Sequence, residues 1–282
     1  MLGQALIHRI QRARGLDQVA EKVSGSVSAV TRPTPVKNAL SGSWLGHQLH
    51  PVLTDLPIGA WGAATALDLT AGEEGAAAAR RLVGMGLIAS APTALAGASD
   101  WSDTNGKDKR VGLVHALLNA TASALQAGSW IARRRGRRGV GVGLSLVAVG
   151  FTGVSAYLGG HLSWVRGIGV NRTAFQKRVG RWTDVAAELD VAEGELRRLT
   201  IDDIPVVLTR HRGQLHALSA VCTHAGGPLD EGTLDADGCV TCPWHGSRFR
   251  LADGGVERGP ASVPQPRWEV RVDAGRVLLR SA

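Results

Sequence analysis

The chain has 282 residues, a formal net charge of +8 and 44% hydrophobic residues. That apolar content is enough for packed cores, and it excludes a disordered tail, a collagen-like repeat and a disulfide-rich miniprotein. The charge is unevenly divided, because residues 1–181 carry 21 basic and 9 acidic side chains whereas residues 182–282 carry 11 and 15. The basic residues of the first part fall in short runs between long uncharged stretches, so no nucleic-acid-binding face is expected.

Residues 1–30, within the first segment (1–40), contain no continuous apolar core of the kind found in a signal peptide. Hydrophobic residues instead recur at helical spacing among polar neighbours, at Leu16, Val19, Val23, Val27 and Val30. This pattern predicts an amphipathic interfacial helix that lies on a membrane surface, and an ordinary solvent-exposed amphipathic helix is the alternative.

Residues 41–165 contain four long segments of low charge, at about 51–71, 82–99, 111–132 and 139–165. The last three have no charged residue, and the first contains Asp55 and Asp68. Because a spanning helix needs roughly 20 mostly apolar residues, we expect a four-helix transmembrane bundle. A soluble bundle of buried, alanine-rich helices is the alternative.

Tryptophan placement favours the membrane interpretation, because indole rings anchor helices at the bilayer interface. Four tryptophans fall at segment ends: Trp44, Trp101, Trp130 and Trp164. With four spans, both chain ends lie on the same side of the membrane. The distribution of basic residues near the spans weakly favours the cytoplasmic side for these ends, because cytoplasmic loops are enriched in Lys and Arg. We therefore expect a multi-pass protein of the inner or plasma membrane.

The second part contains Cys222, His224, Cys242 and His245 in the pattern C-x-H-x17-C-x-x-H. Each of two short loops offers one thiolate and one imidazole, so a two-iron cluster can take both cysteines on one iron and both histidines on the other. A zinc finger presents a pair of cysteines and then a pair of histidines at wider spacing. Another metal is the alternative for these four ligands.

Around this motif, runs rich in Val, Leu and Ile alternate with hairpin-type turns, which predicts a small antiparallel β domain. With the motif, with Gly226-Gly227-Pro228 and with the Gly259-Pro260-Ala261 loop, residues 182–282 resemble a Rieske domain of the ferredoxin-like type. The resemblance implies an all-β domain of small antiparallel sheets, a cluster-binding subdomain and a 2Fe-2S cluster.

Several family positions differ here. Gly227 and Trp244 stand where some relatives have a disulfide between the cluster loops, and Cys239 is expected to be a packed structural cysteine. A chain without disulfides fits the reducing cytosol, and so places the Rieske domain on the cytoplasmic side. Ser247 resembles the family serine that hydrogen-bonds a cluster sulfur, and Phe249 replaces a tyrosine of high-potential members. We predict a low or middle potential within roughly −150 to +300 mV.

Residues 46–59 and 158–162 resemble an uncharacterised family of four-helix membrane proteins. Three histidines near one membrane face, His50, His115 and His161, are candidate haem ligands or quinone partners, since ionisable residues within a membrane are costly. The alternative is that they cap helices or lie in wet interfacial loops.

The expected organisation is an interfacial segment (1–40), a transmembrane domain (41–165), a basic linker (166–181) and a Rieske domain (182–282). The expected function is one-electron transfer between a membrane-side partner, either a protein or a quinone, and a soluble partner. The chain would then be a component of an oxidoreductase system, not a self-contained enzyme. The alternative is a redox or iron-sulfur sensor whose cluster state regulates the bundle, and a third possibility is that the bundle only anchors the domain.

Overall fold

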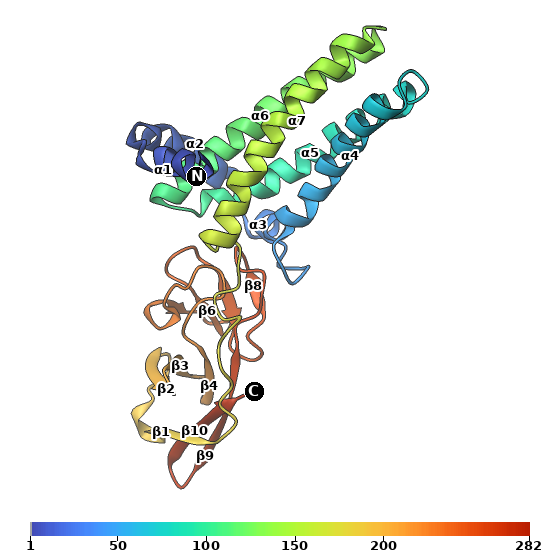
Figure 1. Ribbon diagram of the computed structural model, residues 1–282. Coiled ribbons are helices and arrows are strands. Elements are labelled where there is room, and N and C mark those ends of the chain that lie inside the picture. Colours follow the sequence, from blue (N-terminus) through green and yellow to red (C-terminus); the bar gives the residue numbers. More distant parts are fainter. Residues whose placement is uncertain (1) are drawn as a thin grey trace. The chain divides into compact units, whose positions relative to one another are not determined.

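The computed structural model describes residues 2–282, which form seven α-helices followed by ten β-strands (Figure 1). The chain divides into two compact units. The helical unit comprises the described residues up to Arg32 together with Leu49–Ile168, and the β unit comprises Pro33–Gln48 and Gly169–Ala282.

The helical unit consists of two short helices and four long ones. The short helices are α1 (Leu2–Arg12) and α2 (Asp17–Thr31); the long ones are α4 (Leu49–Thr70), α5 (Ala76–Ser102), α6 (Gly106–Arg134) and α7 (Arg138–Gly160), which continues as a π-helical turn, η2 (His161–Val165). Figure 1 shows α4 with α5 and α6 with α7 as two antiparallel hairpins. The expectation of four helices is therefore wrong, because residues 2–282 form seven: these six and α3 (Thr34–Ser41), which belongs to the β unit. The four long helices correspond to the four predicted segments, and a criterion of membrane-spanning length does not detect shorter ones.

Two of the described helices are long and apolar enough to cross a membrane, namely α5 and the continuous stretch Arg138–Val165. Helix α5 exposes large apolar side chains at Met85, Ile88 and Leu95. Such an exposed apolar surface is compatible with contact with lipid, because a bilayer core is as apolar as these side chains.

Helix α2 turns polar side chains toward α6. Asp17 accepts a hydrogen bond from Arg110 Nε at 2.6 Å, and Glu21 accepts one from Lys109 Nζ at 3.1 Å. The valines of the predicted amphipathic stripe lie on the other side of α2, where Val19, Val23 and Val30 are exposed.

The β unit has two antiparallel sheets. A six-stranded sheet has the order β1-β10-β9-β4-β3-β2, and a four-stranded sheet has the order β5-β6-β7-β8. Their strands are β1 (Thr183–Ala187), β2 (Arg197–Ile201), β3 (Ile204–His211), β4 (Gln214–Ser219), β5 (Thr233–Leu234), β6 (Cys239–Thr241), β7 (Arg248–Arg250), β8 (Val256–Arg258), β9 (Arg267–Asp273) and β10 (Arg276–Ser281). One hydrophobic core surrounds Trp268, and a second surrounds Phe249. The all-β expectation for this part is met. The candidate ligands lie in two connections: the β4–β5 connection, which joins the two sheets, and the β6–β7 connection within the smaller sheet.

A segment from the N-terminal part of the chain belongs to the β unit. Helix α3 (Thr34–Ser41) ends at Gly42, whose φ of 75° is the left-handed conformation common after helix C-termini. Asn38 Nδ2 donates to the Glu257 carbonyl at 3.0 Å, and Gln48 Nε2 donates to the Pro260 carbonyl at 3.3 Å. These contacts attach residues 33–48 to β8 and to the loop that follows it.

Candidate metal centre

Two loops of the β unit close in the same way and carry the four candidate ligands. The first begins at Cys222 after β4, and the second begins at Cys242 after β6. Each cysteine N–H donates to the carbonyl five residues later, at 2.9 and 2.8 Å, and each cysteine carbonyl accepts from a glycine N–H four residues later, at 2.9 and 3.1 Å. Those glycines, Gly226 and Gly246, have φ of 84° and 71°, which only glycine adopts without strain.

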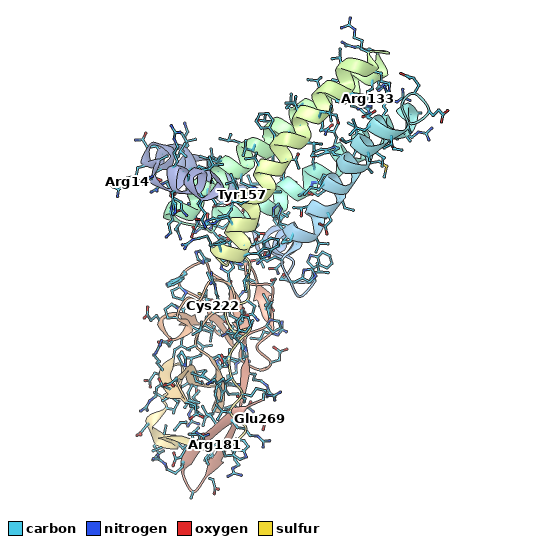
Figure 2. All side chains as sticks on the ribbon, in the orientation of Figure 1. Arg14, Arg133, Tyr157, Arg181, Cys222 and Glu269 are labelled. Carbon is cyan, nitrogen blue, oxygen red and sulfur yellow. The ribbon has the colours of Figure 1, made fainter. Side chains whose placement is uncertain are left out.

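The loops bring like ligands together. The thiols of Cys222 and Cys242 are hydrogen-bonded to each other and are 1% and 3% exposed. The imidazole rings of His224 and His245 have their centroids 4.9 Å apart. Figure 2 labels Cys222 within this part of the β unit. Residues 2–282 contain no group of three or more His, Cys, Asp or Glu side chains that converges on a single metal ion. A thiol pair beside an imidazole pair therefore fits a cluster of two irons better than one ion.

Electrostatics around the ligands favours the protonation states that bind metal. Burial lowers the pKa of His224 to about 3, and the neighbouring His245, Lys37 and Arg172 add to this effect. The ring is thus neutral and able to donate a lone pair. The hydrogen bond from the Cys222 thiol lowers the pKa of Cys242 to about 7, whereas the same bond together with burial raises the pKa of Cys222. The first thiolate therefore forms at Cys242.

Ser247 is fully buried, and its Oγ accepts a hydrogen bond from the Ala261 N–H at 3.0 Å. Because that bond uses an oxygen lone pair, the hydroxyl proton is available to another acceptor, such as a cluster sulfur. Arg258 Nη1 donates to the carbonyls of Gly246 and Gly259, at 2.7 and 2.9 Å. This guanidinium holds the second ligand loop and the 259–261 loop together.

Gly227 and Trp244 stand at the two positions where some relatives have a disulfide, and the two residues are close neighbours. A Cβ atom at residue 227 would lie 2.8 Å from Cys242 Sγ and 3.0 Å from Trp244 Cγ. The first ligand loop therefore needs glycine there. All three cysteines are free thiols, and Cys239 is buried on β6.

Sequence reasoning missed two buried polar residues at this centre. Gln265 is 1% exposed, donates through Nε2 to the Ser219 and Val221 carbonyls and accepts the Thr223 N–H, so it braces the first ligand loop. Lys37 is 3% exposed and acts electrostatically on His224. Neither belongs to a motif, so no sequence signal could have found them.

Of the three membrane-domain histidines singled out from the sequence, two come together. The ring centroids of His50 on α4 and His115 on α6 are 6.4 Å apart, with an angle of 89° between the ring planes. His161 lies apart from this pair, and its charged neighbours are Arg166, Asp108, His8 and Lys107.

Comparison with known proteins identifies both parts of the chain. Residues 181–269 match the Rieske [2Fe-2S] domain family, and residues 46–172 match a family described as predicted membrane protein (DUF2231). Ferredoxin CarAc of Metapseudomonas resinovorans is 36% identical over 99 residues, which are 35% of this chain and 92% of that protein.

Two further relatives match the same part of the chain. The cytochrome b6-f complex iron-sulfur subunit of Chlorobaculum tepidum is 32% identical over 95 residues, which are 33% of this chain and 50% of that protein. Mouse Apoptosis-inducing factor 3 is 32% identical over 93 residues, which are 33% of this chain but only 15% of that protein. From these matches and the geometry of the two ligand loops, the chain belongs to the Rieske [2Fe-2S] family and joins that domain to a predicted membrane domain.

Proposed function

We propose that this protein is a membrane-anchored Rieske protein that transfers single electrons between a membrane-side redox partner and a soluble partner. The observation that carries the proposal is the pairing of two buried thiols with two half-buried imidazoles in matched loops. A Rieske cluster bound there supplies a one-electron carrier with a potential of roughly −150 to +300 mV.

The chain's own residues support access of a partner from the histidine side. The cysteines are buried, whereas His224 and His245 are half-buried and Trp244, next to the His245 ring, is 57% exposed. Exposed tryptophan is a frequent anchor of protein–protein contacts. Electrons would therefore enter and leave through the imidazole edges, and a soluble partner would cover Trp244.

The relatives support the same role. One is named a ferredoxin and another is named as the iron-sulfur subunit of a cytochrome complex. By this proposal the helical unit is a multi-pass anchor in the inner or plasma membrane, with α4–α7 as its spans, and the Rieske domain lies on the cytoplasmic side, where free thiols persist. The alternative of a redox sensor makes a different kinetic prediction.

The test uses the full-length protein in detergent or nanodiscs. We expect about two irons and two labile sulfides per chain and a Rieske-type EPR signal after reduction, which Cys242→Ser should abolish and the matched control Cys239→Ser should preserve. Rapid oxidation of the reduced cluster by an added acceptor, with repeated turnover, supports a relay. Redox-dependent conformational change without turnover would favour the sensor, and absence of iron and sulfide would refute both.

A further inference from the structure

The four long helices of the helical unit form two equivalent hairpins. His50 Nδ1 on α4 is 3.0 Å from the Thr93 carbonyl on α5, and His115 Nδ1 on α6 is 2.8 Å from the Ser155 carbonyl on α7. His115 follows His50 by 65 residues, and Ser155 follows Thr93 by 62. The same contact is thus made twice, once in each hairpin.

Another contact repeats with the same spacing, 65 residues from α4 to α6 and 62 residues from α5 to α7. Trp61 Nε1 donates to the Val83 carbonyl at 3.3 Å, and at the equivalent positions Gln126 Oε1 accepts from Ser145 Oγ at 3.0 Å. The two hairpins are therefore internal repeats that run in the same direction. A parallel repeat in a membrane protein implies a local two-fold axis along the bundle.

Equivalent residues of the two repeats meet across this axis. Helix α4 packs against α5 and α7, and so does α6, so α4 and α6 lie on a diagonal of the bundle. Near one end, Arg133 Nη1 on α6 donates to Asp68 Oδ1 on α4 at 2.9 Å, and these two positions are again 65 residues apart. Figure 2 labels Arg133 near the turn that joins α6 to α7. Eighteen residues earlier in each helix, about 27 Å away, His50 and His115 form the second pair.

Both imidazoles are oriented in the way that metal-ligating histidines usually are. A backbone carbonyl can only accept a hydrogen bond, so each Nδ1 carries the proton and each Nε2 carries a lone pair. Each ring also packs on a glycine of the partner helix. A Cβ atom added at Gly97 would lie 2.6 Å from His50 Cε1, and one added at Gly159 would lie 3.1 Å from His115 Cε1. The repeats thus fix the tautomer and the position of both rings.

We propose that His50 and His115 are the two axial ligands of a b-type haem bound between the hairpins on the local two-fold axis. Two metal–imidazole bonds of about 2 Å each, with about 1 Å from each nitrogen to its ring centre, place such rings roughly 6 Å apart. The observed separation of their centroids is 6.4 Å. The porphyrin supplies the other four nitrogens, so two protein ligands suffice.

The alternatives fit less well. A single ion without a porphyrin needs three or four protein ligands, and residues 2–282 contain no such group. A quinone headgroup needs hydrogen-bond donors, whereas both Nδ1–H groups are already used by carbonyls. Asn119 Nδ2 donates to His115 Nε2 at 3.1 Å, and an iron at that nitrogen would replace this hydrogen bond. The inference rests on the proposed function in one respect: in that electron transfer, this haem would be the redox centre on the membrane side.

The experiment uses full-length protein produced with a haem precursor and purified in mild detergent. We expect one haem b per chain by the pyridine haemochrome method, a low-spin optical spectrum, and a highly anisotropic low-spin EPR signal, because the ring planes are perpendicular at 89°. His50→Ala and His115→Ala should each lose the low-spin species. His161→Ala and Asn119→Ala are matched controls that should keep it.

The Rieske EPR signal of each variant reports whether the chain still folds. His50→Met adds a second safeguard, because it should retain a haem with a changed axial ligand and a shifted potential. Wild-type protein with a full cluster signal but no haem, even after reconstitution with haemin, would overturn the proposal, as would bound quinone without haem or low-spin haem in both alanine variants. Haem without a cluster would instead support this site and refute the proposed function.

Discussion

Asn38 fixes the backbone of Gly259 although the two residues are 221 positions apart. Asn38 Oδ1 accepts the Gly259 N–H at 2.9 Å, while its Nδ2 donates to the Glu257 carbonyl. The loop held in this way also supplies the Ala261 N–H that orients Ser247. A residue that precedes all four long helices thus helps to position a group beside the cluster ligands.

We expect Asn38→Ala to destabilise the β unit by about 1–3 kcal/mol, because two hydrogen bonds are lost and the Gly259 N–H is left without its acceptor. Thermal unfolding, followed by loss of the cluster absorbance, measures the effect. Asn38→Asp keeps an acceptor for Gly259 and should lose less stability than Asn38→Ala. Equal losses in the two variants would show that the Gly259 contact contributes nothing.

Lys37 should raise the reduction potential of the cluster. Its side chain is 3% exposed and acts on His224, and a buried cation stabilises the added electron of the reduced state. An interaction of about 1–2 kcal/mol corresponds to roughly 40–90 mV for one electron, so Lys37→Met should lower the potential by about that amount.

Protein-film voltammetry measures this shift. Lys177→Met removes the same charge from an exposed position of the β unit and serves as the control. The two variants should differ clearly in potential, and the same small shift in both would rule out a specific role for Lys37.

The sequence was informative where chemistry is local and uninformative where it depends on the fold. The ligands Cys222 and His245 were found because cluster binding requires fixed residue types at fixed spacing. Residues 33–48 are attached to the β unit by individual hydrogen bonds, such as those of Asn38. These contacts have no sequence periodicity, so no sequence pattern predicts them.

The membrane histidines illustrate a related limit. The sequence pattern groups His161 with His50 and His115 because all three fall near the same membrane face: His50 and His115 near the start of their helices, and His161 just after the end of α7. A residue's position along a helix does not tell which neighbouring helix its side chain faces. The packing of the helices therefore decides that His50 meets His115 whereas His161 has other neighbours. The repeat that relates the hairpins is not evident in the sequence, because matching positions such as Trp61 and Gln126 make equivalent contacts with different side-chain types.

Ser247 and Phe249 should shift the cluster potential in opposite directions. If the Ser247 hydroxyl donates to a cluster sulfur, Ser247→Ala removes a hydrogen bond that favours the reduced state and lowers the potential by several tens of mV, about 1–2 kcal/mol. Phe249→Tyr would add a hydroxyl in the buried core and raise the potential. Voltammetry of both variants beside the wild type is the measurement. A potential unchanged by Ser247→Ala would remove the serine from the cluster's hydrogen-bonding partners.

The ion pair between Asp68 and Arg133 should be essential for the stability of the helical unit. Both side chains are nearly fully buried, at 1% and 3% exposure, and Arg133 Nε also donates to Ser129 Oγ at 3.1 Å.

Asp68→Ala leaves a buried guanidinium without its carboxylate, which typically costs about 3–5 kcal/mol. Glu73→Ala removes a carboxylate that is 83% exposed and paired with Arg138 at 3.7 Å, so its effect should stay below about 1 kcal/mol. Thermal unfolding in detergent compares the two. The charge swap Asp68→Arg with Arg133→Asp tests the two-fold relationship, because an exchange between equivalent positions restores an ion pair across the same axis. Recovery of part of the lost stability is expected, and a double variant no more stable than Asp68→Ala would show that the two positions are not interchangeable.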